Sequence, residues 1–184
     1  LRFIKTANSA QIEMSYATYS DPDTTLLLAK VNKGLYNIKL TDVTIDDLDE
    51  MTDPSVTSNL LFADKAINSV EIKDSALNVQ SNLSLLNSAG SRIKSIDLSY
   101  NLDGDENPIL VPLTVNADDF ISRQKVLDKI KGRYMVDIEN ATAKQALQMS
   151  SNPHVSTIDI EDTASNFSSY WNQLRGSFFQ TKFW

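Results

Sequence analysis

The chain has 184 residues, of which 41% are hydrophobic and 22% charged, as is typical of a globular protein. Its 24 acidic and 17 basic residues give a formal net charge of −7, which disfavours nucleic acid and anionic membrane as partners because phosphates need basic neutralisation. The longest apolar run, Leu26 to Ala29, is far too short to span a membrane. Because there is no cysteine and His154 is the single histidine, disulfides, thiolate zinc sites, cysteine nucleophiles and His-rich metal sites are disfavoured.

The first half of the chain predicts short strands that alternate with helices. Its predicted strands lie at residues 2–5, 11–17, 35–40 and 70–72, with apolar and polar residues alternating in the last two. Thr44 and Asp47 occupy the places of a helix capping box, and Pro54 marks the exit from that helix. A second helix follows Ser75, and its apolar face is formed by Ala76, Val79, Leu83 and Leu86.

The second half predicts the same sequence of elements. A strand at 93–98 and a strand at 109–115 are joined by the turn Asp103 to Pro108, which indicates a hairpin with a longer loop. A helix is predicted from Asn116 or Asp118 to about Ile130, ended by Gly132. A strand at 134–138, a helix capped by Thr142 and Gln145, and a strand at 158–160 follow, with Pro153 at the exit of that helix. The last helix has its apolar face at Ala164, Phe167, Trp171 and Leu174.

These two halves match as an internal repeat. Residues 33–51 match residues 131–149 at a separation of 98, and Asp53 to Val56 match Asn152 to Val155 at 99. Residues 70–86 match 158–174 at a separation of 88, so the first copy carries about eleven extra residues, placed near Asn59 to Asn68. Gln11 to Ala17 match Leu110 to Asn116 in pattern. The apolar faces of the last helices in both copies have the same 3, 4, 3 spacing.

The repeat predicts an α/β fold of two tandem β-β-α-β-α-β-α units. Because the strands are short and half polar, we expect a two-layer, solenoid-like arrangement with helices on one face of a sheet and solvent on the other. Repeat unit 1 is expected at residues 1–89 and repeat unit 2 at 90–184, packed as one continuous domain. The chain begins at Leu1, which indicates a piece of a longer protein.

The segment from Pro153 to Asn166 resembles a repeat of very large bacterial secreted and surface proteins. The other pieces that match this pattern are Val70 to Leu86, Ile93 to Leu98 and Ala117 to Tyr134, so the resemblance covers most of both copies. It implies an adhesin-like or type I secreted, calcium-associated exoprotein and brings no catalytic residue with it. The family's usual Asp-Gly-Gly-Thr-Pro turn is replaced here by Asp103 to Pro108, and the helices are less rich in alanine.

Several polar groups are candidates for binding, and each has a structural alternative. The turn residues Asp103, Asp105, Glu106 and Asn107 offer oxygen ligands for calcium, but the last bidentate acid of a calcium loop is missing, and a solvated turn is favoured. The acidic run Asp42, Asp46, Asp47, Asp49 and Glu50 suits a solvated helix start. The recurring pairs Asp74/Asp162 and Asn78/Asn166 lie beside Ser75 and Thr163, which predicts helix capping. No cofactor is therefore expected, with calcium as the alternative.

Two further features differ between the copies. His154 aligns with Ser55 and is interpreted as a surface loop residue. The C-terminal aromatic residues Phe178, Phe179, Phe183 and Trp184 suit packing on a neighbouring repeat, with a sugar- or partner-binding patch as the alternative.

The leading functional hypothesis is a non-enzymatic repeat module of a secreted or cell-surface bacterial protein, acting as a spacer or an adhesion scaffold. Its partners would be neighbouring repeats and a host or cell-surface protein or glycan, without nucleic acid or membrane insertion. The second hypothesis is an effector-type interaction domain that binds a partner through its exposed sheet face, at Lys39, Glu71, Asp137 and Asp159. The third is a carbohydrate-active domain with paired carboxylates, although nothing in the sequence places two acids together.

Overall fold

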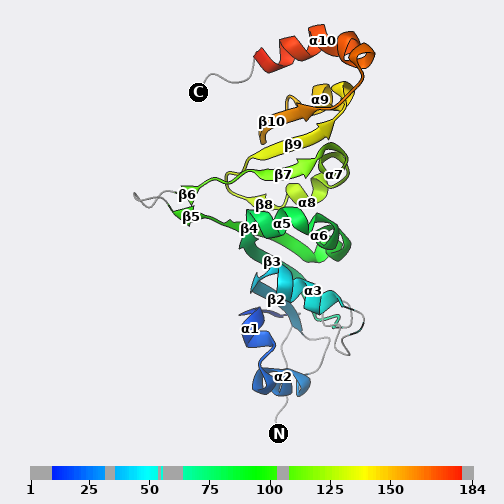
Figure 1. The fold of residues 1–184 in the computed structure, drawn as a ribbon. Helices are drawn as coiled ribbons and strands as arrows, with labels where there is room; N and C mark the ends of the chain where they lie inside the picture. Colours follow the sequence, from blue (N-terminus) through cyan, green and yellow to red (C-terminus); the bar gives the residue numbers. More distant parts are fainter. Residues whose placement is uncertain (1–9, 32–35, 54, 56–63, 103–107, 180–184) are drawn as a thin grey trace. The chain divides into compact units, whose positions relative to one another are not determined.

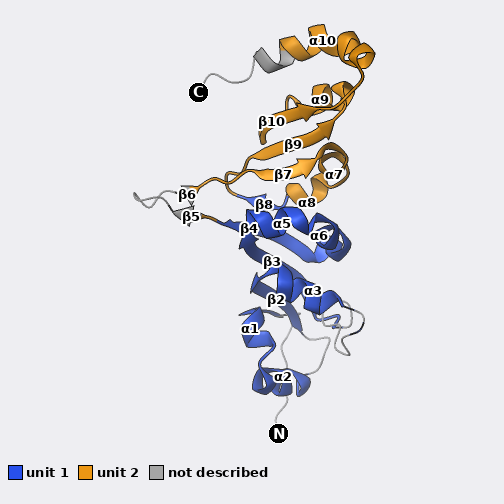
Figure 2. Cartoon of the chain, in the orientation of Figure 1, with its two compact units in different colours: residues 1–99, 129–131 blue, residues 100–128, 132–184 orange. Residues whose placement is uncertain are grey.

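The protein is a mixed α/β structure, as the sequence predicts, and its two larger sheets are parallel (Figure 1). This computed structural model describes residues 10–31, 36–53, 55, 64–102 and 108–179. The chain divides into two compact units, residues 1–99 with 129–131 and residues 100–128 with 132–184 (Figure 2). These units divide the chain by contacts, whereas the repeat boundary after residue 89 divides it by sequence similarity and stays a prediction. The predicted strand at 2–5 lies outside the described residues.

Unit 1 is built on a five-stranded parallel sheet in the order β1-β2-β3-β4-β8. Its strands are β1 (Ala10–Ser15), β2 (Tyr36–Val43), β3 (Ile67–Ser75), β4 (Ile93–Ser99) and β8 (Ile130–Lys131). Its helices are α1 (Tyr16–Tyr19), α2 (Pro22–Ala29), α3 (Ile45–Thr52), α5 (Ala76–Ser81) and α6 (Leu83–Ala89), followed by the 3₁₀ turn η1 (Gly90–Arg92). From β1 to β4, each strand pairs in parallel with the next along the chain, and the described part of each connection contains helix.

The core of unit 1 lies between the sheet and its helices. In β2, Ile38 and Leu40 are fully buried while Lys39 between them is half-buried, because successive side chains of a strand point to opposite faces. Leu48 of α3 and Leu86 of α6 are also fully buried. Apolar residues therefore line one face of the sheet, and the opposite face is polar.

Unit 2 holds a three-stranded parallel sheet in the order β7-β9-β10, with a separate antiparallel pair β5-β6. Its strands are β5 (Asn101–Leu102), β6 (Pro108–Ile109), β7 (Leu113–Asn116), β9 (Val136–Ala141) and β10 (Val155–Ile160). Its helices are α7 (Ala117–Ser122), α8 (Gln124–Leu127), α9 (Ala143–Met149) and α10 (Ala164–Phe179). The predicted hairpin is confirmed only for β5 and β6. The longer strands on either side of it, β4 and β7, belong to different sheets.

Four predicted elements need correction. The strand expected at residues 109–115 is divided into β6, which ends at Ile109, and β7, which begins at Leu113. The helix expected from Asn116 to Ile130 breaks at Arg123, where φ is −114° and ψ is 19°, and it ends at Leu127. Ile130 instead pairs with Ile96 in the sheet of unit 1, and Gly132, with a φ of 78°, follows that short strand and does not end a helix. The helix expected at residues 76–86 is likewise split, at Asn82. The strand expected at residues 134–138 begins two residues later, at Val136, and runs on to Ala141.

The two units share irregularities that strands rarely have by chance. Asp42 and Asn140, at a separation of 98, both have positive φ, of 54° and 56°. Asp and Asn tolerate this left-handed region better than most residues. Each lies at a register shift of the same kind: the four residues from Leu40 to Val43 face three residues of β3, and the four from Ile138 to Ala141 face three residues of β10.

The structure moves the position of the extra residues in the first copy away from the one that the sequence alignment gives. The turn from Asn152 to Val155 repeats the bonds of the turn from Asp64 to Ile67, at a separation of 88. The side chain of Asn152 accepts from the N–H of His154 at 2.9 Å, and that of Asp64 accepts from the N–H of Ala66 at 2.9 Å. His154 therefore corresponds to Ala66 in the structure, and the extra residues of the first copy precede Asp64.

The N-terminal match shifts as well. Ile12 pairs with Ile38 as Leu113 pairs with Val136, which gives a separation of 101 in place of 99. A shift of two residues keeps the same side chains on the same face of a strand, so the sequence pattern could not distinguish the two alignments.

Candidate functional site

Polar side chains gather where the parallel strands end and the helices begin. In both units the residue that ends or directly follows a strand caps a helix: Ser15, Thr44, Ser75, Asn116 and Thr142 each accept from the backbone N–H three residues on. The capping boxes predicted at Thr44 with Asp47 and at Thr142 with Gln145 are both confirmed. Parallel strands place all these helix starts of a unit along one edge of its sheet.

Asp74 connects two of these helix starts. One carboxylate oxygen, Oδ1, accepts from the N–H of Ser75 at 2.7 Å and from the side-chain amide of Asn78 at 2.8 Å. The other, Oδ2, accepts from the N–H of Ile45 in α3 at 2.8 Å. A capping box would need the side chain of Asn78 to accept from the N–H of Ser75; Asn78 instead donates to the aspartate that joins α5 to the preceding helix.

Asp162 makes the same set of bonds in unit 2. Its oxygens accept from the N–H of Thr163 at 2.7 Å, the amide of Asn166 at 2.8 Å and the N–H of Ala143 in α9 at 3.0 Å. The hydrogen bond from Asn166, followed by that from the N–H of Ala143, lowers the pKa of Asp162. A structural role at the helix starts is thus confirmed for both Asp–Asn pairs, but it differs from the one expected: each aspartate accepts from backbone N–H groups at the starts of two helices, and each asparagine donates to that aspartate.

A pH dependence follows from this lowered pKa. The folded state holds the carboxylate of Asp162 better than the unfolded chain does, so its contribution to stability is present at neutral pH and is lost as pH falls through the folded pKa. The stability difference between the natural protein and Asp162→Asn should be constant from about pH 5 to 8 and should shrink below about pH 4. Urea unfolding at a series of pH values measures it. Asp159→Asn is the control, since no hydrogen bond of the described structure holds that side chain; the same shrinkage there would contradict the assignment.

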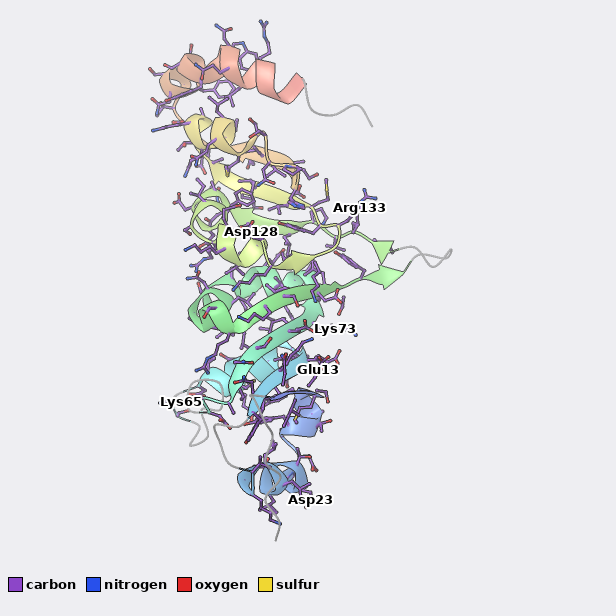
Figure 3. All side chains as sticks on the ribbon, turned by 180° about the vertical axis from the view of Figure 1, so that it is seen from behind. Glu13, Asp23, Lys65, Lys73, Asp128 and Arg133 are labelled. Carbon is purple, nitrogen blue, oxygen red and sulfur yellow. The ribbon has the colours of Figure 1, made fainter. Side chains whose placement is uncertain are left out.

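The polar face of the unit 1 sheet carries a chain of ion pairs, and we call it the open face of unit 1. Lys39 lies 3.1 Å from Glu13 and 3.3 Å from Glu71, and Lys131 lies 3.3 Å from Glu71, measured between side-chain nitrogen and oxygen. These residues come from β1, β2, β3 and β8, so the charges alternate in sign across the sheet. Glu13, at one end of this series of ion pairs, is labelled in Figure 3. Lys73 is labelled there too, and its side-chain nitrogen lies 3.6 Å from a carboxylate oxygen of Asp42.

Two small residues leave room for these pairs. Ser69 and Ser95 are the buried polar residues among the described part of the chain, and in the sheet register they lie beside Lys39 and Glu71, respectively. Lys131 therefore reaches Glu71 across β4. Burial by itself would raise the pKa of Glu71, but its bonds to Lys39 and Lys131 outweigh that effect and lower the pKa. Glu13, Lys39, Glu71 and Lys131 are thus paired with one another within the unit.

Replacing Glu71 with glutamine should lower the free energy of unfolding by less than about 1 kcal/mol, because partly exposed ion pairs contribute little. The loss should shrink in 1 M NaCl, where exposed charges are screened. Urea unfolding at low and high salt measures both quantities. Glu139→Gln, an exposed strand residue of unit 2, is the matched control and should leave stability unchanged. A loss at Glu71 that is independent of salt would show that the ion pairs are not its source.

The corresponding face of unit 2 is acidic. Asp137 and Asp159 replace Lys39 and Glu71 at the repeat separations of 98 and 88, and Glu139 and Asp159 are exposed. Asp137 accepts from the hydroxyl of Thr157 at 2.7 Å. Strands β7, β9 and β10 contain no lysine or arginine. The four residues that the sequence assigned to one interaction face thus fall into a neutralised set in unit 1 and an acidic set in unit 2.

His154 lies in the turn before β10, as predicted for a loop residue, but its ring packs on Tyr134, which precedes β9. Their rings are stacked with centroids 3.9 Å apart and an interplanar angle of 9°, and the ring Nδ1 of His154 lies 3.3 Å from the carbonyl oxygen of Tyr134. The hydroxyl of Tyr134 donates to the carbonyl of Leu127 at 3.3 Å, and burial raises the pKa of Tyr134 to about 12. These contacts give His154 a packing role.

The remaining candidates give no reactive centre within the described residues. A pocket of about 240 Å³ in unit 2 is lined by Phe120, Ile121, Gln124, Gln148, Met149 and Asn152. It has no carboxylate in its lining and does not supply paired acids. No group of three or more His, Asp or Glu that could hold a metal ion lies among the residues that are described. The proposed calcium turn at 103–107 and the aromatic residues Phe183 and Trp184 lie outside them, as do the side chains of Phe178 and Phe179.

The sequence missed Glu13 and Lys131 as members of the open face of unit 1. Glu13 could have been found, because it alternates with Ile12 and Met14 in an amphipathic segment. Lys131 could not, since it follows a pattern that predicts a helix and reaches the sheet only through the short strand β8.

Comparisons with known proteins give the chain no relative: no family model matches it, and no curated protein or solved structure matches it significantly. None of the helices in the described part of the chain has the length and apolar character needed to cross a membrane.

Proposed function

We propose that the chain is a non-enzymatic repeat module of a large bacterial secreted or cell-surface protein, in which it acts as a structural spacer or as a scaffold for adhesion. The observation that carries this proposal is the bond network of Asp74, which recurs at Asp162 with the same donors and nearly the same distances. A network that joins successive helices in both units preserves architecture. It suits a module that is multiplied in tandem.

The strand order supports the same proposal. In unit 1 the strands β1 to β4 pair in parallel, each with the one before it, and in unit 2 β7, β9 and β10 do the same. Helices lie between successive strands of each series. Such a sequence can be extended by further units of the same kind, as in a two-layer solenoid with a β-β-α-β-α-β-α pattern. On the open face of unit 1, Lys39, Glu71 and Lys131 pair with charges of the same unit, which suits a module whose contacts are mainly internal.

The cellular part of the proposal is tested with antibodies raised against the 184-residue chain. In the source bacterium they should detect a polypeptide much longer than this chain, in the medium or on intact cells, where added protease removes the signal. A cytosolic polypeptide of about this length, protected in intact cells and lacking further copies, would refute the proposal.

A second function, binding of a partner through the sheet face, is favoured by the acidic residues of unit 2. Glu139 and Asp159 are exposed on strands without a basic residue, so a basic partner surface would fit them. Reversing both charges to lysine should abolish capture of such a partner in a pull-down with surface extracts. Lys39→Glu in unit 1 is the matched control, because its partners lie within the unit. Unchanged capture by the unit 2 variant would exclude this surface.

A further inference from the structure

One end of unit 2 leaves apolar residues exposed whose counterparts in unit 1 are buried. Val70 and Ile72 of β3 are 0% and 1% exposed, whereas Ile158 and Ile160 of β10, at the separation of 88, are only half-buried. Leu83 of α6 is 4% exposed, but its counterpart in α10, Trp171, is 48% exposed. The same apolar pattern is therefore covered in one unit and uncovered in the other.

The cause lies in the sheet order. β3 has β2 on one side and β4 on the other, while β10 is an edge strand that pairs with β9. The inner part of α10 packs normally, since Leu174 is 2% exposed and its counterpart Leu86 is 0% exposed. On its outer side β10 thus has no strand among the described residues where β3 has β4. The matched unit thus specifies the missing neighbour as a parallel strand.

The edge strand β10, Val155 to Ile160, contains neither lysine nor proline, two residues that commonly protect such an edge from pairing. Half-exposed isoleucines alternate with polar residues along it. An edge of this kind is suited to pairing with another strand.

The charges at this edge indicate what kind of strand fits. In unit 1 Lys73 lies opposite Asp97 of β4, but its counterpart in unit 2 is Glu161, which is exposed. Asp159, the counterpart of Glu71, is exposed as well, and β9 offers it no lysine, whereas Glu71 is paired with both Lys39 and Lys131. An incoming strand would therefore need basic residues where β4 carries acidic or small ones.

We propose that β10 and α10 form a docking edge for one further parallel strand, supplied by the next strand–helix unit of the parent protein. This strand has the alternating apolar residues of β4, which cover Ile158, Ile160 and Trp171, and basic residues facing Asp159 and Glu161. The identity of the occupant rests on the proposed function as a repeat module; the pairing edge itself rests on the burial and charge of unit 2.

The test attaches such a strand to the protein. The chain contains two tryptophans, so Trp184→Phe leaves Trp171 as the single fluorescent reporter. A copy of residues 91–99 carrying Asp97→Lys is appended through a Gly/Ser linker. A linker of about ten residues is sufficient, because η1 joins α6 to β4 with three residues in unit 1. Tethering gives the strand an effective concentration in the millimolar range.

Two matched variants complete the design. One carries the same appended strand with Asp97 retained, and the other has aspartate in place of Ile93, Ile96 and Leu98 in the appended copy. The reference is the variant with the three aspartates. Compared with it, the form with Asp97→Lys in the appended strand should show at most half the acrylamide quenching of Trp171 and at least tenfold slower amide exchange in residues 155–160. The form with Asp97 should show a smaller effect, and the difference between the two should narrow in 1 M NaCl.

Equal quenching and equal exchange in all three variants would overturn the proposal. So would dimerisation of the untethered protein that shields Trp171, because the occupant would then be a second copy. This experiment does not depend on where the parent protein resides. A cytosolic location would refute the proposed function, but it would not change a positive result with the appended strand. An appended strand without effect would refute the docking edge, even if the parent protein were found at the cell surface.

Discussion

Replacing Asp74 with alanine is expected to lower the free energy of unfolding by about 2–4 kcal/mol, one of the two largest effects expected of single substitutions here. The carboxylate accepts three hydrogen bonds, from the N–H groups of Ile45 and Ser75 and from the amide of Asn78. Alanine removes all three acceptor contacts at once. The N–H of Ile45 belongs to a residue that is 2% exposed, so water compensates this donor poorly.

Urea unfolding of the variant measures this loss, and hydrogen exchange locates it. The amides at the starts of α3 and α5 should exchange faster, while those of α9 in unit 2 should not change. Asp74→Asn is the control, because it keeps one oxygen that can accept from Ile45 and should lose roughly half as much stability. The double variant with Asn78→Ala should lose less than the sum of the single losses, since Asp74 and Asn78 share one bond. A loss below about 0.5 kcal/mol for Asp74→Ala would show that the network does not hold the two helices together.

The capping residues were predictable and the connection between helices was not. Ser75 and Thr163 precede amphipathic segments, and each accepts from the N–H three residues on, as a local pattern requires. The bond between Asp74 and Ile45 joins residues 29 positions apart. Its existence depends on β2 and β3 being neighbours in the sheet, which no local pattern encodes.

The largest error in the predicted elements has a similar origin. Ile130 follows Leu127 at the spacing of one helical face, so the pattern extends the helix to it. In the structure its backbone pairs with Ile96, because a place beside β4 in the sheet offers hydrogen bonds and burial that the end of a helix does not. Tertiary contacts override local propensity here, and they also bring Lys131 to Glu71.

The difference between the two units is the part of the candidate site that the sequence could not reveal. The helices beginning at Ala76 and Ala164 have the same apolar spacing, and both patterns predict a buried face. Burial depends on whether a strand lies beyond β3 or β10, and only the sheet order supplies that information.

This difference leads to the second large effect, a contrast between Leu83→Ala and Trp171→Ala. Leu83 is 4% exposed, and its truncation should lower the free energy of unfolding by about 2–4 kcal/mol, through lost burial and the cavity left behind. Trp171 occupies the matching position but is 48% exposed, so its truncation should cost about 1 kcal/mol or less, although the tryptophan is the larger side chain. Urea unfolding of both variants measures the contrast.

Leu86 and Leu174 provide the matched control, because they are 0% and 2% exposed at equivalent positions of the same helices. Their replacement by alanine should be similarly costly in both units, about 2–4 kcal/mol. Comparing Leu86→Ala with Leu174→Ala shows whether the two units differ in stability in general. If they do not, the contrast between Leu83 and Trp171 comes from how far each side chain is buried. If Trp171→Ala proved as costly as Leu83→Ala, the end of unit 2 would already be covered within this chain, and a docking edge would have nothing to bury. If the contrast holds, adding the proposed strand should raise the cost of truncating Trp171 toward that of Leu83.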